Sequence, residues 1–232
     1  MTPAPIAVAL DAPDLETAAQ WASLVTPHVS TVKVGLELYL RYGPDVIASV
    51  RGASGVQVFL DLKLHDIPNT VAGASRAVAR LRPAILTVHA AGGPAMIRAA
   101  VESAADNTKI AAVTILTSLT EDDLGRIGLL GPADEAVRRL AGMAVEAGAT
   151  ALVCSPNEVS AVRAEVGPGV TLITPGVRPA GAAAQDQARV ATPEQALADG
   201  ADLLVIGRPI TGAADPGAAA AAIAASLRRQ LS

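Results

Sequence analysis

The stretch VQVFLDLKLHDIPNT (56–70) joins a strand pattern to a concentration of charge. Its first half is a nearly continuous apolar run, which is typical of a strand buried on both faces in a parallel sheet. Alternation along such a strand puts Phe59, Asp61 and Lys63 on one face and Leu60 on the other. An unpaired charge in a protein interior costs several kcal/mol, so these two ions indicate a site rather than ordinary core.

Short β-rich runs like this one recur along the whole chain, with segments between them that are long enough for a helix. The predicted strands are 6–11, 31–36, 56–63, 85–90, 110–116, 151–155, 171–176 and 203–208. Helices are predicted over 15–25, 68–81, 94–103, 133–147, 193–197 and, from its alanines, 218–225. Strand–helix alternation predicts right-handed crossovers and a parallel sheet. Eight such units without a break in composition favour a single-domain α/β fold over 1–232, a (β/α)8 TIM barrel, over a doubly wound sheet.

The composition limits the class of protein and its surroundings. The chain has 232 residues, of which 51% are hydrophobic and 17% charged, with a net charge of -4 and no basic cluster, so no nucleic-acid partner is expected. Its one cysteine, Cys154, excludes an internal disulfide and fits a reducing compartment. No apolar run approaches the roughly 20 residues of a membrane span. We therefore expect a cytoplasmic globular protein that does not enter membranes.

Four charged residues are predicted to meet at the carboxyl-terminal mouth of the barrel. Asp11 ends the first strand, and Lys33 lies on the inward face of the second, beside Asp61 and Lys63 of the third. Alternating acid and base gives each ion an oppositely charged neighbour, which lowers the cost of holding all four in a poorly solvated site. Barrel enzymes carry their chemistry at this end, so the set predicts a catalytic array. The alternative is a salt-bridge network that only closes the barrel.

A second cluster follows the last two predicted strands. The segments TPGVRP (174–179) and IGRP (206–209) place glycines and arginines where barrels commonly bind phosphate through backbone N–H groups and a cation. Between them, 178–190 is a run of small and polar residues without a strand period, and it is a candidate lid. These features predict a ligand that carries a phosphate.

Taken together, these motifs resemble the orotidine 5′-phosphate decarboxylases. The resemblance extends from the first strand to the eighth and rests on VALD (8–11), KVG (33–35), FLDLKLHDIPNT (59–70), TPGVRP (174–179), DQ (186–187) and VIGRPIT (205–211). It implies decarboxylation of orotidine 5′-phosphate to uridine 5′-phosphate and carbon dioxide, the last step of de novo pyrimidine biosynthesis. It also implies a homodimer with shared active sites.

The resemblance assigns roles at the reacting carbon. Lys63 would stabilise the developing carbanion and donate the proton, with Asp61 and Asp66 fixing its ammonium group. Lys33 would join this charge array. Nothing in the sequence looks like a cofactor site, and we expect no metal, so the stabilisation would be electrostatic.

The remaining matched positions would bind substrate. Asp11 and Lys33 would hold the ribose hydroxyls, and Asp66, Ile67 and Thr70 belong to a loop that would reach the neighbouring subunit's site. Thr120 is the best match for the residue that reads the pyrimidine edge, although the segment TSLT (117–120) offers several hydroxyls. The predicted phosphate ligands are Arg178, Gln187, Gly207 and Arg208.

Two other functions are compatible with parts of this pattern. Metal-dependent relatives acting on keto-sugar phosphates, such as keto-gulonate-phosphate decarboxylase and hexulose-phosphate synthase, share the D-x-K-x-x-D element but place an acidic magnesium ligand where this chain has Lys33. An ammonium group cannot ligate magnesium, which prefers oxygen donors. The other alternative is a non-catalytic barrel that senses a nucleotide or sugar phosphate. Binding alone would not need the array around Asp61 and Lys63.

Overall fold

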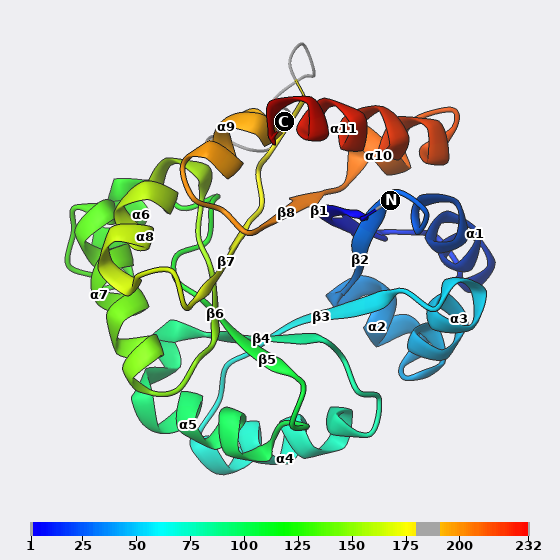
Figure 1. Cartoon of the computed structure of the whole chain (residues 1–232). Coiled ribbons are helices and arrows are strands. Elements are labelled where there is room, and N and C mark those ends of the chain that lie inside the picture. The colour runs from blue at the N-terminus through cyan, green and yellow to red at the C-terminus, as the bar shows by residue number, and fades with distance from the viewer. Residues whose placement is uncertain (1, 180–190, 232) are drawn as a thin grey trace.

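The structure is a computed structural model that describes residues 2–179 and 191–231. The described residues form a closed barrel of eight parallel strands, in which each strand pairs with the next and β8 pairs with β1 (Figure 1). The strands are β1 (Ala4–Ala9), β2 (Val29–Gly35), β3 (Gln57–Leu64), β4 (Ile85–His89), β5 (Lys109–Val113), β6 (Ala151–Val153), β7 (Thr171–Thr174) and β8 (Leu203–Ile206). The predicted TIM barrel is confirmed.

Helices surround this barrel on its outside (Figure 1). Within the described residues they are α1 (Leu15–Val25), α2 (Leu36–Tyr42), α3 (Asp45–Ser54), α4 (Pro68–Ala79), α5 (Gly93–Ser103), α6 (Glu121–Arg126), α7 (Ala133–Glu146), α8 (Val159–Val166), α9 (Pro193–Ala198), α10 (Arg208–Thr211) and α11 (Pro216–Leu231). All six predicted helices are present, with ends that shift by one or two residues, except that α11 continues six residues past its predicted end. The fifth strand stops at Val113 rather than at 116, because both of its neighbours, β4 and β6, end opposite Val113.

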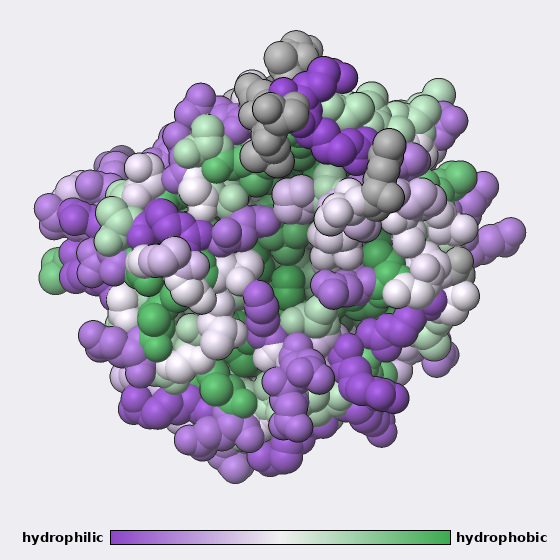
Figure 2. Space-filling model, in the orientation of Figure 1, coloured by the Kyte–Doolittle hydropathy of each residue, from purple (hydrophilic) through white to green (hydrophobic). Residues whose placement is uncertain are grey.

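Two apolar layers hold the barrel together. The inward layer is built from small and medium side chains around Phe59, including Ala7, Ala111 and Ile173, all nearly inaccessible to solvent. The outward residues of the strands, such as Leu60, pack against the helices in a second and larger cluster. Space-filling colours show hydrophobic residues at the centre of the ring and mainly hydrophilic ones around it (Figure 2).

The third strand departs from regular pairing where its charges begin. Its register with β4 runs from Leu60 opposite Leu86 to Leu64 opposite Val88, so three residues of β3 face the single residue Thr87. Lys63 lies within this bulge and has a φ of +48°, in the left-handed region that residues other than glycine seldom adopt. Strict alternation predicted the inward face of β3 but not this irregularity.

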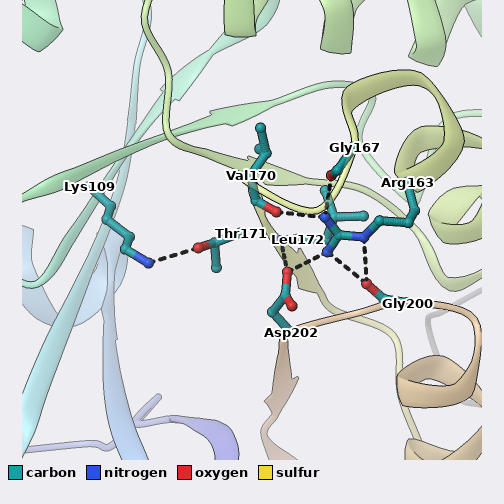
Figure 3. A network of polar contacts seen from close by, with 8 residues as sticks. All are labelled: Lys109, Arg163, Gly167, Val170, Thr171, Leu172, Gly200 and Asp202. Carbon is teal, nitrogen blue, oxygen red and sulfur yellow. Dashed lines mark hydrogen bonds and ion pairs between the residues drawn. The ribbon is translucent and has the colours of Figure 1, made fainter.

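The amino-terminal end of the barrel is tied together by Arg163 of α8 (Figure 3). Its guanidinium donates to the carbonyls of Gly167, Val170 and Gly200 at 2.7–3.2 Å and pairs with Asp202. Asp202 also accepts from the backbone N–H of Leu172 at 2.7 Å. Nearby, Lys109 at the start of β5 donates to Thr171 at 2.8 Å. These contacts join the starts of β7 and β8 to the helix between β6 and β7.

Candidate active site

Asp61 is at the centre of the charged array at the carboxyl-terminal mouth. Its two carboxylate oxygens each accept from Lys63 Nζ at 2.9 Å, and its Oδ2 lies 3.4 Å from Lys33 Nζ. The side chains of Asp61 and Lys33 are only 11% and 12% exposed, whereas that of Lys63 is 30% exposed. The predicted meeting of β2 and β3 charges therefore takes place, with two ammonium groups sharing one carboxylate.

Burial and charge act in opposite directions on Asp61. Burial alone would raise the pKa of this carboxyl group, but the positive charges of Lys33 and Lys63, with hydrogen bonds from Lys63 and Thr87, outweigh it and leave the pKa below its usual value. Asp61 is therefore ionised at neutral pH, and it stabilises the ammonium charge beside it.

A cavity of about 210 Å³ opens directly above these ions. Lys33, Asp61 and Lys63 line one side of it, and apolar residues from the ends of β5 to β8 line the rest, among them Ile115, Val153, Pro175 and Val205. A wider hollow of about 700 Å³ lies at the other end of the barrel, around Arg51 and Arg82. We place the active site in the smaller cavity, because it lies at the carboxyl-terminal mouth, where barrel enzymes carry their chemistry, and is lined by the ion-paired Lys33, Asp61 and Lys63.

Glycine at position 35 leaves room for this array. A Cβ atom there would lie 3.1 Å from Lys33 Nζ and 3.5 Å from Asp11 Oδ1. Lys33 and Asp11 therefore approach the same point at the end of β2, as the sequence predicted. The sequence motif contained Gly35, but the close approach that requires it is visible only in three dimensions.

His65 and His89 form a ring pair beside Lys63, with centroids 5.4 Å apart. Burial lowers the pKa of His89, the positive charges of His65 and Lys63 lower it further, and Asp61 only partly opposes this. His89 is therefore neutral at pH 7. It closes the inward face of β4 next to the lysine without adding charge.

Three of the four predicted phosphate ligands, Arg178, Gly207 and Arg208, lie just after β7 and β8. Arg178 is 9% exposed, and its backbone N–H donates to the carbonyl of Ala191 at 2.9 Å. Gly207 directly follows β8, and Arg208 begins α10 and is exposed. Pro175, two residues before Val177, lines the cavity, so β7 leads from the cavity toward Arg178. Gln187 and most of the candidate lid lie outside the described residues.

Asp66, Ile67 and Thr70 are all exposed, and none of them is among the described residues that line the cavity of their own chain. Asp66 accepts from the backbone N–H of Ile67 at 2.6 Å. No ion pair with Lys63 is found for Asp66 in the described part of the chain, where Asp61 alone holds that ammonium group. Their predicted reach to a neighbouring subunit's site stays a prediction.

The TSLT segment presents two threonines in different settings. Thr117 lines the cavity. Thr120 begins α6, where its hydroxyl donates to Asp123 at 2.7 Å and accepts from the backbone N–H of Asp123 at 3.3 Å. The predicted role of Thr120 at the pyrimidine edge stays a prediction, and Thr117 is the hydroxyl of this segment that the cavity reaches.

Within residues 2–179 and 191–231, no three His, Cys, Asp or Glu side chains come together in a way that would hold a metal ion. None of the helices in the same residues combines the length and apolar character that crossing a bilayer requires.

Sequence reasoning missed one residue that touches the charged array. Thr87 lies on the inward face of β4 and is fully buried, and its hydroxyl bonds to both Asp61 and the backbone of Lys63. The only signal in the sequence was its position two residues before His89 on the same face of the strand.

A parallel eight-stranded barrel with a charged, partly apolar cavity at its carboxyl-terminal mouth defines the class of (β/α)8-barrel enzymes. The family model described as "Orotidine 5'-phosphate decarboxylase / HUMPS family" matches residues 4–223. The chain belongs to this family, and it is a carbon–carbon lyase of the carboxy-lyase type.

Individual relatives are similar over nearly their full length. An orotidine 5′-phosphate decarboxylase of Thermobifida fusca (strain YX) is 75% identical over 97% of this chain and 97% of its own. One from Frankia casuarinae is 58% identical over 97% of this chain and 88% of its own. The crystal structure of orotidine 5′-phosphate decarboxylase from Lactobacillus acidophilus matches with a TM-score of 0.83 at 38% identity, covering 97% of this chain and 99% of that one.

Proposed function

We propose that this protein decarboxylates orotidine 5′-phosphate to uridine 5′-phosphate and carbon dioxide, without metal or cofactor, as the last step of de novo pyrimidine biosynthesis. The observation that carries the proposal is the ammonium group of Lys63, held by both oxygens of a buried Asp61 that Lys33 also faces, at the edge of the cavity. The relatives named above support the substrate.

The chemistry needs a fixed positive charge beside one carbon. When the bond between C6 and the carboxylate breaks, its electron pair stays in the plane of the pyrimidine ring, where the π system cannot delocalise it. Lys63 would stabilise that pair and then transfer a proton from Nζ to C6. An ammonium group has three donors, and within the described residues Lys63 Nζ donates only to the two oxygens of Asp61, so at least one donor is left for a ligand.

Asp61 and Lys33 would complete this environment. Asp61 keeps Lys63 charged until the proton is needed, and its own charge would repel the substrate carboxylate until carbon dioxide leaves. Both of its oxygens are already engaged by ammonium groups and by Thr87, so Asp61 itself has no vacant oxygen for a magnesium ion. This engagement supports a reaction that proceeds without a metal.

Substrate binding would extend along the cavity from the ions to the last two strands. Asp11 and Lys33 would bind ribose hydroxyls, Thr120 the pyrimidine edge, and Arg178, Gln187, Gly207 and Arg208 the phosphate. Binding energy from a phosphate far from C6 can hold the substrate against Lys63 and exclude water, which raises the rate of a step that the phosphate does not join.

A spectroscopic assay tests the reaction. Purified protein is mixed with orotidine 5′-phosphate in excess EDTA, and the loss of orotate absorbance is followed in the ultraviolet. We expect full turnover in the chelator. Absence of turnover would refute the substrate, and turnover that requires added magnesium would instead indicate a metal-dependent sugar-phosphate enzyme of the same family.

We further propose a homodimer in which Asp66, Ile67 and Thr70 of one subunit complete the site of the other. Ile67 is 66% exposed and Leu40, on α2 at the same end of the barrel, is 79% exposed, so two large apolar side chains lie there uncovered in one chain. The exposed positions of Asp66 and Thr70, away from their own cavity, support the same arrangement.

Mixed dimers test the sharing of sites. Lys63→Ala and Asp66→Asn are each expected to be inactive alone. In an equimolar mixture that exchanges subunits, half of the dimers contain one intact site, so activity should recover to about a quarter of wild type. Failure to recover, with exchange verified by native mass spectrometry, would contradict shared sites.

We place the protein in the cytoplasm, because its one cysteine is buried and forms no disulfide, which fits a reducing compartment.

A further inference from the structure

The irregular seam between β3 and β4 leaves the reacting lysine without ordinary strand pairing. Between the paired positions Leu60–Leu86 and Leu64–Val88, Asp61, Leu62 and Lys63 face Thr87 alone. One residue of β4 cannot offer main-chain partners to three residues of β3. Side-chain atoms must therefore replace part of the ladder at the point where the charges lie.

Thr87 supplies this replacement with a single hydroxyl group. Its Oγ1 accepts from the backbone N–H of Lys63 at 2.8 Å and donates to Asp61 Oδ1 at 2.9 Å. The direction of both bonds is fixed, because a backbone N–H only donates and an ionised carboxylate only accepts. The side chain is fully buried, so no solvent competes for either bond.

The two bonds act on two members of the array at once. The bond to Lys63 holds its backbone at a φ of +48°, which costs free energy for a residue with a side chain and persists only where neighbours enforce it. The bond to Asp61 fixes the oxygen that also receives Lys63 Nζ. A change at Thr87 would therefore move both ends of the ion pair relative to the cavity.

We propose that Thr87 is a positioning residue for the decarboxylation: its hydroxyl sets the backbone of Lys63 and the carboxylate of Asp61 in one geometry. Thr87 itself does not line the cavity among the described residues and touches no reacting atom in this assignment. The inference rests on the proposed function, because it acts through Lys63 and Asp61.

The test replaces the hydroxyl while keeping the shape. Thr87→Val is expected to lower kcat by about ten- to a hundredfold, because Asp61 loses a hydrogen bond and the ammonium donor of Lys63 is misplaced. The KM for orotidine 5′-phosphate should change by less than about threefold. Thr87→Ser restores the hydroxyl and should restore kcat to within about threefold of wild type. Thr87→Ala is measured in parallel, so that a failure of the valine variant to fold does not prevent a decision.

Thr31→Val is the matched control. Thr31 is also a buried, inward-facing threonine, but it lies two residues before Lys33 and its hydroxyl contacts that of Ser30 at 3.2 Å. This variant should keep wild-type kcat even if its melting temperature falls. It separates loss of a buried hydroxyl in general from loss of the one that holds Asp61 and Lys63.

Three outcomes would overturn the inference: wild-type kcat in the folded Thr87→Val or Thr87→Ala protein, a serine variant as impaired as the alanine variant, or an equal loss of kcat in Thr31→Val. Failure of the proposed function is distinguishable, because it would show as absence of turnover in the wild-type protein. With an active wild type, the Thr87 series tests the positioning role alone.

Discussion

The two ends of the barrel use charge in different ways. At the amino-terminal end, the guanidinium of Arg163 donates hydrogen bonds to three carbonyls and pairs with the carboxylate of Asp202. One positive charge therefore meets one negative charge, and all of these partners are protein groups. At the carboxyl-terminal mouth, Lys33 and Lys63 share the single carboxylate of Asp61 beside a cavity. The first arrangement joins strands, whereas the second holds charged groups beside a cavity.

This difference shows how a structural ion network is distinguished from a reactive one. In a network that only stabilises the fold, the hydrogen-bonding and charged groups are paired with one another, as those around Arg163 are (Figure 3). The mouth array differs, since it borders a cavity and holds Lys63 in a strained backbone conformation. Its charged groups face space in which a ligand can bind.

The largest effect should come from removing Lys63. Lys63→Ala is expected to lower kcat by at least about 10⁴-fold, because both the stabilising charge and the proton donor are lost, while the fold is kept. Lys109→Ala removes a lysine at the other end, where Nζ bonds to Thr171, and should leave kcat unchanged. Steady-state kinetics and circular dichroism check both. An active Lys63→Ala enzyme would remove the central difference between the two ends.

Arg208 should show the next largest effect on activity. Arg208→Ala is expected to lower kcat/KM for orotidine 5′-phosphate by about two orders of magnitude, since a charge-assisted contact to phosphate is lost. This corresponds to about 3 kcal/mol of transition-state stabilisation. A truncated substrate without phosphate should be nearly indifferent to the change. An equal loss with both substrates would show that Arg208 does not grip the phosphate.

Arg163 should affect stability instead of chemistry. Arg163→Ala breaks bonds to three carbonyls and leaves Asp202 without its cation, and we expect the free energy of unfolding to fall by about 2 kcal/mol. The kcat should stay at the wild-type value. Urea unfolding and kinetics on the same preparation measure the two quantities. A variant that keeps its stability but loses turnover would reverse the roles assigned to the two ends.

The smallest effect concerns pH. The pKa of His89 lies below its unfolded value of about 6.5, so the unfolded chain binds the proton more readily. Stability should therefore decline as pH falls through about 6.5 and level off below the folded-state pKa. Urea unfolding of wild type and His89→Gln across this range checks it. The variant should lose less stability on acidification, and parallel curves would show that His89 is not responsible.

The sequence was sufficient for the barrel and for most of the array. Strand–helix alternation and inward parity placed Lys33, Asp61 and Lys63 together, because these depend on local periodicity and on closure of the sheet. The bulge was not predictable, since alternation assumes that each residue of β3 faces one residue of β4. Thr87 escaped notice for the same reason.

The roles of two other parts of the predicted site could not be read from strand periodicity, because they depend on a second chain or on the path of a turn. Asp66 was predicted both to fix Lys63 and to reach a neighbouring subunit, and within a single chain it lies exposed beside Ile67. The segment 117–120 contains several hydroxyls, and only its path after β5 shows that Thr117 lines the cavity while Thr120 begins a helix. Sequence alone cannot order such a turn.

The sparse pairing at Leu60–Leu64 has a consequence for how the protein fails under heat. Fewer paired positions hold this stretch than hold the adjoining seams β2–β3 and β4–β5, so thermal opening should reach it before those seams. Catalytic competence would then fade at a lower temperature than the far-ultraviolet signal of the helices. Lost activity in an ageing sample would thus be an early sign of damage that spectroscopy has not yet registered.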